Sequence, residues 1–200
     1  MTLVIALMSL VLLSALGISL AVVMTTELRA TTNYAMSRES MYAADGALQI
    51  AAHELLTVAD VNVLLSGGGT LSAFVDGPPS GPRRLGDGST VDLTQATTAA
   101  NAEPRPWGAN NPVWRLFAFG WLGPRTYVIA WAADDSHEND GDPLVDGGGV
   151  TNPGARILAL RAEAFGVGGA HKVLEATVRR EEDTAGAPRI RVLSWHEIRQ

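Results

Sequence analysis

Residues 3–24 read LVIALMSLVLLSALGISLAVVM, an apolar stretch that holds no charged residue and no proline. At about 1.5 Å of rise per residue, a helix of this length is roughly 33 Å long, which is enough to cross the hydrocarbon core of a bilayer. The first proline of the chain is Pro78, so the helix can continue well beyond the apolar stretch. The sequence therefore predicts a membrane-spanning helix that extends into water.

The residues after the apolar stretch keep a helical spacing of apolar positions, in steps of three and four, which places those positions on one stripe of a helix. The glycines at 67–69 are a signal for the end of a helix. We therefore expect one helix over residues 3–65, roughly 90 Å long. Its stripe would pack on the rest of the chain, while its first half enters a membrane or a bundle of equivalent helices. The stripe consists of Met41, Ala44, Leu48, Ala51 and Leu55.

The last 88 residues are rich in β-branched and aromatic residues and contain five segments typical of strands. Short turn signals separate most of these segments, which favours an antiparallel meander. The expected strands are Val113–Leu122, Thr126–Ala133, Ala155–Phe165, His171–Glu181 and Arg189–Ile198. The fold class that follows is α+β, with a long N-terminal helix packed on a C-terminal antiparallel sheet.

The chain is expected to have four parts. Residues 1–26 form the membrane or fibre-core half of the helix, and residues 27–65 form its amphipathic half. Residues 66–112 are a loop-rich connection, with weak strand candidates at Leu71–Val75 and Thr90–Leu93, and residues 113–200 form the sheet domain. The glycines and prolines fall almost wholly after residue 65, where continuous helix gives way to loops and strands.

Composition excludes several classes of protein. The formal net charge of −6 argues against a nucleic-acid partner, because such proteins present a basic surface. The chain has no cysteine, which excludes a thiol nucleophile and a disulfide framework. His53, His137 and His196 each begin an H-E-x-x-H pattern whose second histidine is missing. No G-x-S-x-G elbow is present either, so we expect a protein that is not an enzyme.

Three segments together resemble the PilX-type minor pilins of type IV pili. The segment TLVIALMSLVLLSALGISLAVVMTTELRATTN at 2–33 looks like the membrane helix of that family. SRESMYAADGALQIAAHEL, Ser37 to Leu55, is similar to its helical continuation, and RVLSWHEIR, Arg191 to Arg199, looks like its terminal strand. The resemblance covers residues 1–56 well and the sheet only by pattern.

The resemblance implies a structural protein that waits in the bacterial inner membrane and then joins an extracellular pilus. Its partners would be other pilins and minor pilins, and a tip adhesin is a further candidate. Major pilins carry a glutamate at the fifth mature residue, where this chain has Ile5 if Met1 is the first mature residue. The loss of that carboxylate fits a tip-proximal or initiating subunit, which has no neighbour ahead to pair with. The assembly residues are Leu3, Ile5, Leu10, Leu13, Gly17 and Ala21.

Two other interpretations share the same helix: a minor pseudopilin of a type II secretion system and a plain membrane anchor. Two pairs of small residues four apart, Gly17 with Ala21 and Ala15 with Ser19, favour close helix packing over a plain anchor. Two origins of Met1 also stay open. Either a basic leader is removed before it, or the gene start lies elsewhere.

The loop between the second and third expected strands is strongly acidic and is the candidate ligand site. Calcium binds six to eight oxygen ligands, often from closely spaced carboxylates and carbonyls. The spacing does not fit an EF-hand, and a solvated acidic turn is the alternative to a calcium site. A calcium-binding display or adhesion module anchored in a membrane is therefore a second hypothesis of function. The candidate calcium ligands are Asp135, Asn139, Asp140, Asp142 and Asp146.

Overall fold

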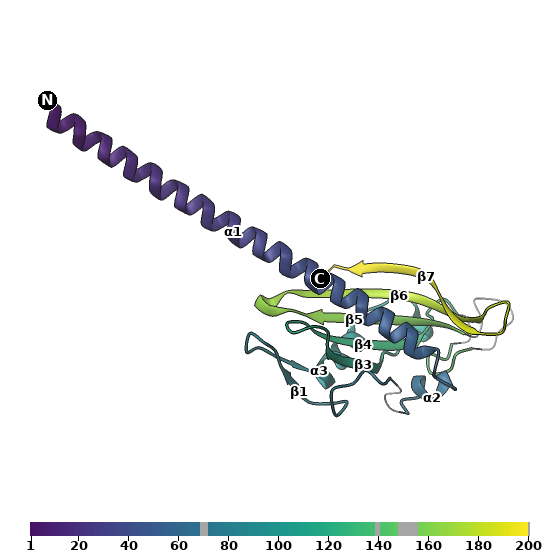
Figure 1. The fold of residues 1–200 in the computed structure, drawn as a ribbon. Helices are drawn as coiled ribbons and strands as arrows, with labels where there is room; N and C mark the ends of the chain where they lie inside the picture. The colour runs from purple at the N-terminus through teal and green to yellow at the C-terminus, as the bar shows by residue number, and fades with distance from the viewer. Residues whose placement is uncertain (69–71, 139–140, 148–155, 200) are drawn as a thin grey trace. The chain divides into compact units, whose positions relative to one another are not determined.

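The computed structural model describes residues 1–68, 72–138, 141–147 and 156–199. The chain divides into two compact units, residues 1–36 and residues 37–200. Helix α1, Thr2–Leu55, begins in the first unit and ends in the second. It is followed by an antiparallel sheet, so the expected α+β fold with a long N-terminal helix on a C-terminal sheet is confirmed (Figure 1).

The helix ends ten residues earlier than the sequence predicted. The amides of Leu56 and Thr57 donate to the carbonyls of His53 and Glu54, three residues back, which tightens the last turn. A separate helix, α2 (Val61–Leu65), then begins after Asp60, whose carboxylate accepts from the amide of Asn62 at 2.9 Å. The prediction of one helix over residues 3–65 was therefore wrong, because an aspartate N-cap starts a second helix before the glycines are reached.

Five strands form one antiparallel meander in the order β3-β4-β5-β6-β7, as expected (Figure 1). The alternating pattern of their residues fixes the register, because a shift of one residue would expose the buried face. Irregularities in register occur between Leu116 and Ala118 and between Thr177 and Val178. The strands are β3 (Arg115–Trp121), β4 (Tyr127–Asp134), β5 (Ile157–Phe165), β6 (His171–Glu182) and β7 (Pro188–Ile198), with the short 3-10 helix η2 (Val167–Gly169) between β5 and β6.

The two faces of the sheet carry two separate cores. On one face, the alanine-rich stripe of α1 and the apolar residues of α2 pack against alternate residues of β3 to β6. Small side chains such as Ala44 and Ala51, both fully buried, allow the helix to lie close to the sheet. On the other face, Trp114 and Trp131 are buried together with Leu93 and Ala100. The second unit is thus a sheet with helices on both faces.

The connection at 66–112 is more ordered than expected. It holds β1 (Pro82–Arg84), β2 (Thr90–Asp92), helix α3 (Leu93–Ala102) and the short 3-10 helix η1 (Gly108–Asn110). The strand candidate at Thr90–Leu93 is confirmed as β2 except for Leu93, which begins α3. Asp92 caps α3 by accepting from the amide of Gln95. Of the candidate at Leu71–Val75, Leu71 lies outside the described residues, and Val75 forms an isolated bridge to Phe119.

Candidate functional site

The apolar helix of the first unit exposes its large side chains on every side. Leu3, Ile5, Leu10 and Leu13 are 81%, 64%, 66% and 68% exposed. Within the part of the chain that the structure describes, α1 is the one helix long and apolar enough to cross a membrane. A helix that is apolar on every side is stable when lipid or other helices surround it. The expected assembly residues therefore lie on a surface that fits a membrane span or a helix bundle.

Small residues shape one part of this surface. Gly17 and Ala21 are one helical turn apart and both are exposed. A Cβ atom added at Gly17 would meet no other atom of the chain within 4 Å. The glycine is thus not needed for packing inside the chain. Its small size allows a second helix to approach closely at this position.

The acidic loop brings three carboxylates together, but not the predicted set. Ligand atoms of Asp134, Glu138 and Asp146 lie within 4.8 Å of one another. Asp134 ends β4 and is buried, as is Glu138, while Asp146 is partly buried. Glu138 also accepts a hydrogen bond from the amide of Gly147 at 3.0 Å. Three carboxylates at such separations offer the type of oxygen ligand that calcium prefers.

Of the five expected calcium ligands, the structure places only Asp146 in this cluster. Asp135 accepts from the amide and ring nitrogen of His137. Asp142 accepts from the amide of Leu144 in an exposed turn. Asn139 and Asp140 lie outside the described residues. The sequence spacing favoured Asn139, Asp140 and Asp142, whereas the fold brings Glu138 and Asp146 of the loop close to the last residue of β4.

Burial raises the pKa of the Asp146 carboxyl group above its ordinary value. The backbone amide of Arg156 donates to both of its oxygens, at 2.7 and 2.8 Å, and this contact acts in the opposite direction. The amide of Asp146 itself donates to the side chain of Asn62, at 2.8 Å. The loop is thereby tied to the start of α2. Its position is set by the fold and not by the acidic residues alone.

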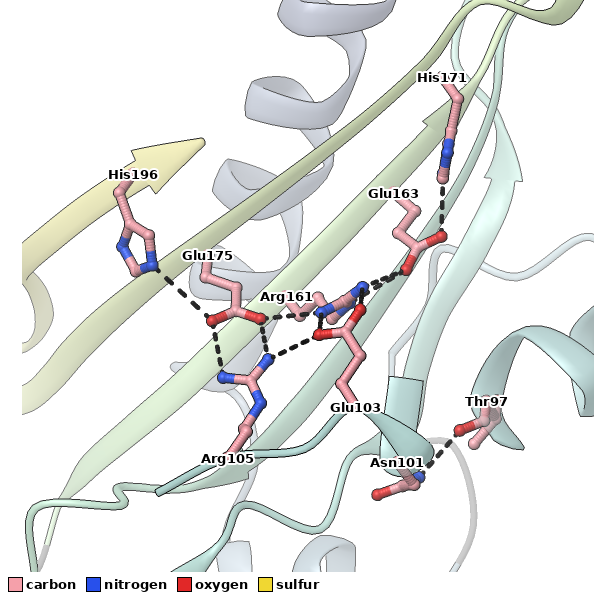
Figure 2. Close-up of polar contacts among 9 residues, drawn as sticks. All are labelled: Thr97, Asn101, Glu103, Arg105, Arg161, Glu163, His171, Glu175 and His196. Atoms are coloured by element: carbon pink, nitrogen blue, oxygen red, sulfur yellow. Dashed lines mark hydrogen bonds and ion pairs between the residues drawn. The ribbon is translucent and has the colours of Figure 1, made fainter. Parts of the chain in front are cut away.

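A second polar cluster, which the sequence did not reveal, lies on the opposite face of the sheet from α1. Arg161 of β5 is 1% exposed and contacts three carboxylates (Figure 2). Its guanidinium donates to Glu103 at 2.7 and 2.8 Å, to Glu163 at 2.8 and 3.0 Å and to Glu175 at 2.9 Å. We call Arg161 with Glu103, Arg105, Glu163 and Glu175 the Arg161 cluster.

Arg105 closes the cluster from the segment that follows α3. It donates to Glu175 at 2.5 and 3.1 Å and lies over the ring of Trp114. Two histidines flank the cluster, His171 at 3.0 Å from Glu163 and His196 at 3.8 Å from Glu175 (Figure 2). The cluster thus joins residues 103–105 to the strands β5 and β6 across the sheet face.

The electrostatics of the Arg161 cluster follow from this pairing. Burial alone would lower the pKa of Arg161, but the hydrogen bonds and charges of Glu103 and Glu163 outweigh it and raise that pKa. Burial would likewise raise the pKa of Glu103, but Arg161 and Arg105 lower it below its ordinary value. Each of the five side chains thus has a side chain of opposite formal charge in contact.

Only one sequence signal pointed to the Arg161 cluster. β5 reads ILALRAEAF, in which Arg161 and Glu163 interrupt an apolar strand at alternate positions. Charged residues inside a strand that is otherwise buried are typically paired. Their partners at 103 and 105 lie in a segment expected to be loop, so the pairing could not be found from the sequence.

Comparisons with models of protein families, with curated proteins and with solved structures find no match for this chain. The class of protein is therefore defined by the fold itself: one candidate membrane-spanning helix at the N-terminus, continuous with an α+β unit.

Proposed function

We propose that this chain is a structural minor pilin. It is held in the bacterial inner membrane by the first half of α1 and assembles into an extracellular type IV pilus through the same helix. Its role there is to prime assembly or to display the α+β unit near the tip. Its partners are other pilins that surround the apolar helix, together with the membrane before assembly. The chain carries out no catalysis in this role.

One observation carries the proposal. Helix α1 is continuous for 54 residues, its apolar first half is exposed on every side, and its second half buries an alanine-rich stripe on the sheet. A simple anchor needs about 20 apolar residues and no helical continuation into the domain that follows. A subunit whose helix must pass from a membrane into a bundle needs both the apolar surface and the continuous connection. The resemblance of residues 1–56 to PilX-type pilins agrees with this assignment.

The substitution Gly17→Leu tests assembly separately from membrane insertion. Leucine keeps the helix apolar, and the position has free space within the chain, so folding and insertion are expected to persist. Close helix packing in a fibre would be blocked. We expect the epitope-tagged variant in the membrane fraction at the wild-type level, with a loss of at least fivefold from sheared extracellular filaments. Leu20→Ile is the matched control.

Three outcomes separate the alternatives. Wild-type protein in membranes but never in extracellular filaments, in a cell that makes pili, would contradict the pilus role and favour a plain anchor. Wild-type protein required for secretion but absent from surface filaments would favour a type II pseudopilin. Equal incorporation of Gly17→Leu and wild type would show that close packing at this position is not needed.

The calcium-binding display module stays a prediction. The observation that bears on it is the proximity of Asp134, Glu138 and Asp146. A cation there would join the end of β4 to the loop that follows it. A rise in melting temperature on adding millimolar calcium, absent in Asp146→Asn, would support this function, and no shift would remove it.

A further inference from the structure

Strand β7 forms one edge of the five-stranded sheet. It is eleven residues long and pairs with β6 alone among the described residues (Figure 1). At the other edge, β3 is partly covered, because Phe119 donates its amide to the carbonyl of Phe74. The outer edge of β7 has no such cover in the described part of the chain. Backbone groups along such an edge are a template for a further strand.

The side of β7 that faces α1 carries two exposed apolar residues. Val192 and Trp195 lie opposite Val178 and Ala176, which belong to the core beneath α1. Yet Val192 is 56% exposed and Trp195 is 45% exposed. Trp195 is held in place, because its ring nitrogen donates to Asp45 of α1 at 3.0 Å. The helix covers the middle of the sheet and leaves this strip open.

The opposite side of β7 carries an uncompensated positive charge. Arg191 lies directly opposite Arg179 of β6. Like charges directly opposite on neighbouring strands destabilise a sheet. No ion pair joins either guanidinium to a carboxylate among the residues that the structure describes, whereas the next pair, Arg189 with Glu181, is in contact at 2.7 Å. A carboxylate beside Arg191 is the group that would complete this surface.

We propose that the free edge of β7 binds an extended segment of a partner protein in which acidic and apolar residues alternate. The partner strand would add to the sheet through backbone hydrogen bonds, which is the binding mode called strand addition. Because successive side chains point to opposite faces, its acidic residues would face Arg191 while its apolar residues cover Val192 and Trp195. This inference does not depend on the pilus role, since the surface lies wholly within residues 37–200.

A second copy of β7 does not meet this requirement. The one acidic residue of β7 is Glu197, which lies opposite Leu174 and so on the side that faces α1. It is also paired with Lys172 at 2.5 Å. Paired residues of neighbouring antiparallel strands share a face, so no antiparallel register of two β7 strands places a carboxylate beside Arg191. In a parallel pairing, the one available carboxylate, Glu197, is already bound to Lys172. The partner strand therefore comes from another sequence.

The test uses the full chain in detergent micelles and a fluorescein-labelled eight-residue peptide of alternating Glu and Val. Fluorescence anisotropy is expected to show saturable binding. The same peptide with alternate amides methylated keeps its charge and side chains but cannot pair along the strand, so it is expected not to bind. A peptide of alternating Lys and Val is expected to bind at least tenfold more weakly.

Substitution of Arg191 tests whether this residue sets the charge preference of the edge. Because Arg191 is exposed, Arg191→Glu is expected to leave the fold intact. It is expected to weaken binding of the Glu–Val peptide at least tenfold and to strengthen binding of the Lys–Val peptide. Arg125→Glu, in the exposed turn between β3 and β4, is the control and is expected to change neither. No saturable binding up to millimolar peptide, equal binding of the methylated peptide, or no effect of Arg191→Glu would each overturn the proposal. So would a dimer of the chain, seen by analytical ultracentrifugation, that Arg191→Glu dissociates.

Discussion

Asp146 carries its carboxyl group in a partly buried position, and this burial raises its pKa. A folded-state pKa above the unfolded value means that folding favours the protonated form. The resulting stability is complete below the unfolded pKa, near 4, and is lost as the pH rises through the folded pKa. The ionised carboxylate is therefore a local cost at neutral pH.

The substitution Asp146→Asn is expected to remove this part of the pH dependence. Asparagine keeps one oxygen to accept from the Arg156 amide but carries no charge. We expect the melting temperature of the variant in chelator-containing buffer to fall less than that of wild type between pH 4 and pH 7. Parallel curves for the two proteins would contradict the assignment. Asp142→Asn, in the exposed part of the same loop, is the control.

Removal of Arg161 is expected to be severely destabilising. Arg161→Met leaves the carboxylates of Glu103, Glu163 and Glu175 without their central partner, and breaking a buried ion pair in this way costs about 3–5 kcal/mol. Tryptophan fluorescence during urea unfolding would measure the loss. Arg125→Met, in an exposed turn, is expected to change stability by less than about 0.5 kcal/mol.

The pH dependence of that loss distinguishes charge from packing. Because Arg161 lowers the pKa of Glu103, the stability that this contact contributes is lost as the pH falls through the folded-state pKa of Glu103, and the cost of removing Arg161 is expected to shrink. A deficit that stays constant between pH 7 and pH 4 would show that the lost packing of the long side chain, and not the unpaired charge, is responsible.

At the scale of single residues, the sequence predicted the environment of side chains that depend on a local pattern. It did not predict which distant side chains form a cluster. The exposed leucines of the first helix follow directly from an uninterrupted apolar run. The contacts of Arg161 with Glu103 span 58 residues of chain, and no local pattern encodes them. The cluster of Asp134, Glu138 and Asp146 depends on where β4 ends, a boundary that the sequence placed one residue too early.

The second half of α1 illustrates an element whose packing could be predicted. The spacing of five apolar residues predicted a buried stripe. Ala44, Leu48, Ala51 and Leu55 are buried against the sheet, while Met41 is only partly buried. Because the helix is held by this stripe, Leu48→Ala is expected to destabilise the second unit by about 2–5 kcal/mol through the cavity left behind. Gln49→Ala, on the exposed side of the same helix, is expected to cost less than about 0.5 kcal/mol. Chemical denaturation of both variants would measure the difference. Equal stabilities would show that the stripe does not anchor the helix to the sheet.

Strands were easier to predict than helix ends and connections. All five strands of the large sheet lie within two residues of their expected bounds, because β-branched runs between turn signals are a strong local pattern. Helix α3 was missed, since LTQATTAANA holds three threonines and few large apolar residues. It is fixed by the cap at Asp92 and by burial of Leu93 and Ala100 against the sheet, and this tertiary packing outweighs weak propensity.

At the scale of the whole molecule, the order of the elements followed from the sequence and the partners did not. A long apolar start, a stripe-bearing continuation and a run of strands suffice to predict an α+β chain with a candidate membrane helix. Two surfaces are exposed among the described residues, the apolar half of α1 and the edge of β7, and exposed apolar surface of this kind is typical of contact with another molecule or with lipid. The sequence of one chain indicates such surfaces but does not identify the molecules that bind them.

One charged substitution tests whether the first half of α1 spans a membrane. Leu13 lies near the middle of the apolar stretch, where a lysine raises the free energy of insertion by about 2.5–3.5 kcal/mol. Leu13→Lys is therefore expected to shift a large share of the protein from the pellet to the supernatant when bacterial membranes are extracted with alkaline carbonate. Thr31→Lys, on the same helix but beyond the apolar stretch, is expected to stay with the membranes. Equal retention of the two variants would mean that contacts of the second unit with a membrane protein hold the chain at the membrane. A lysine at position 13 weakens insertion into lipid and a lysine at position 31 does not, whereas neither lysine would disturb such contacts.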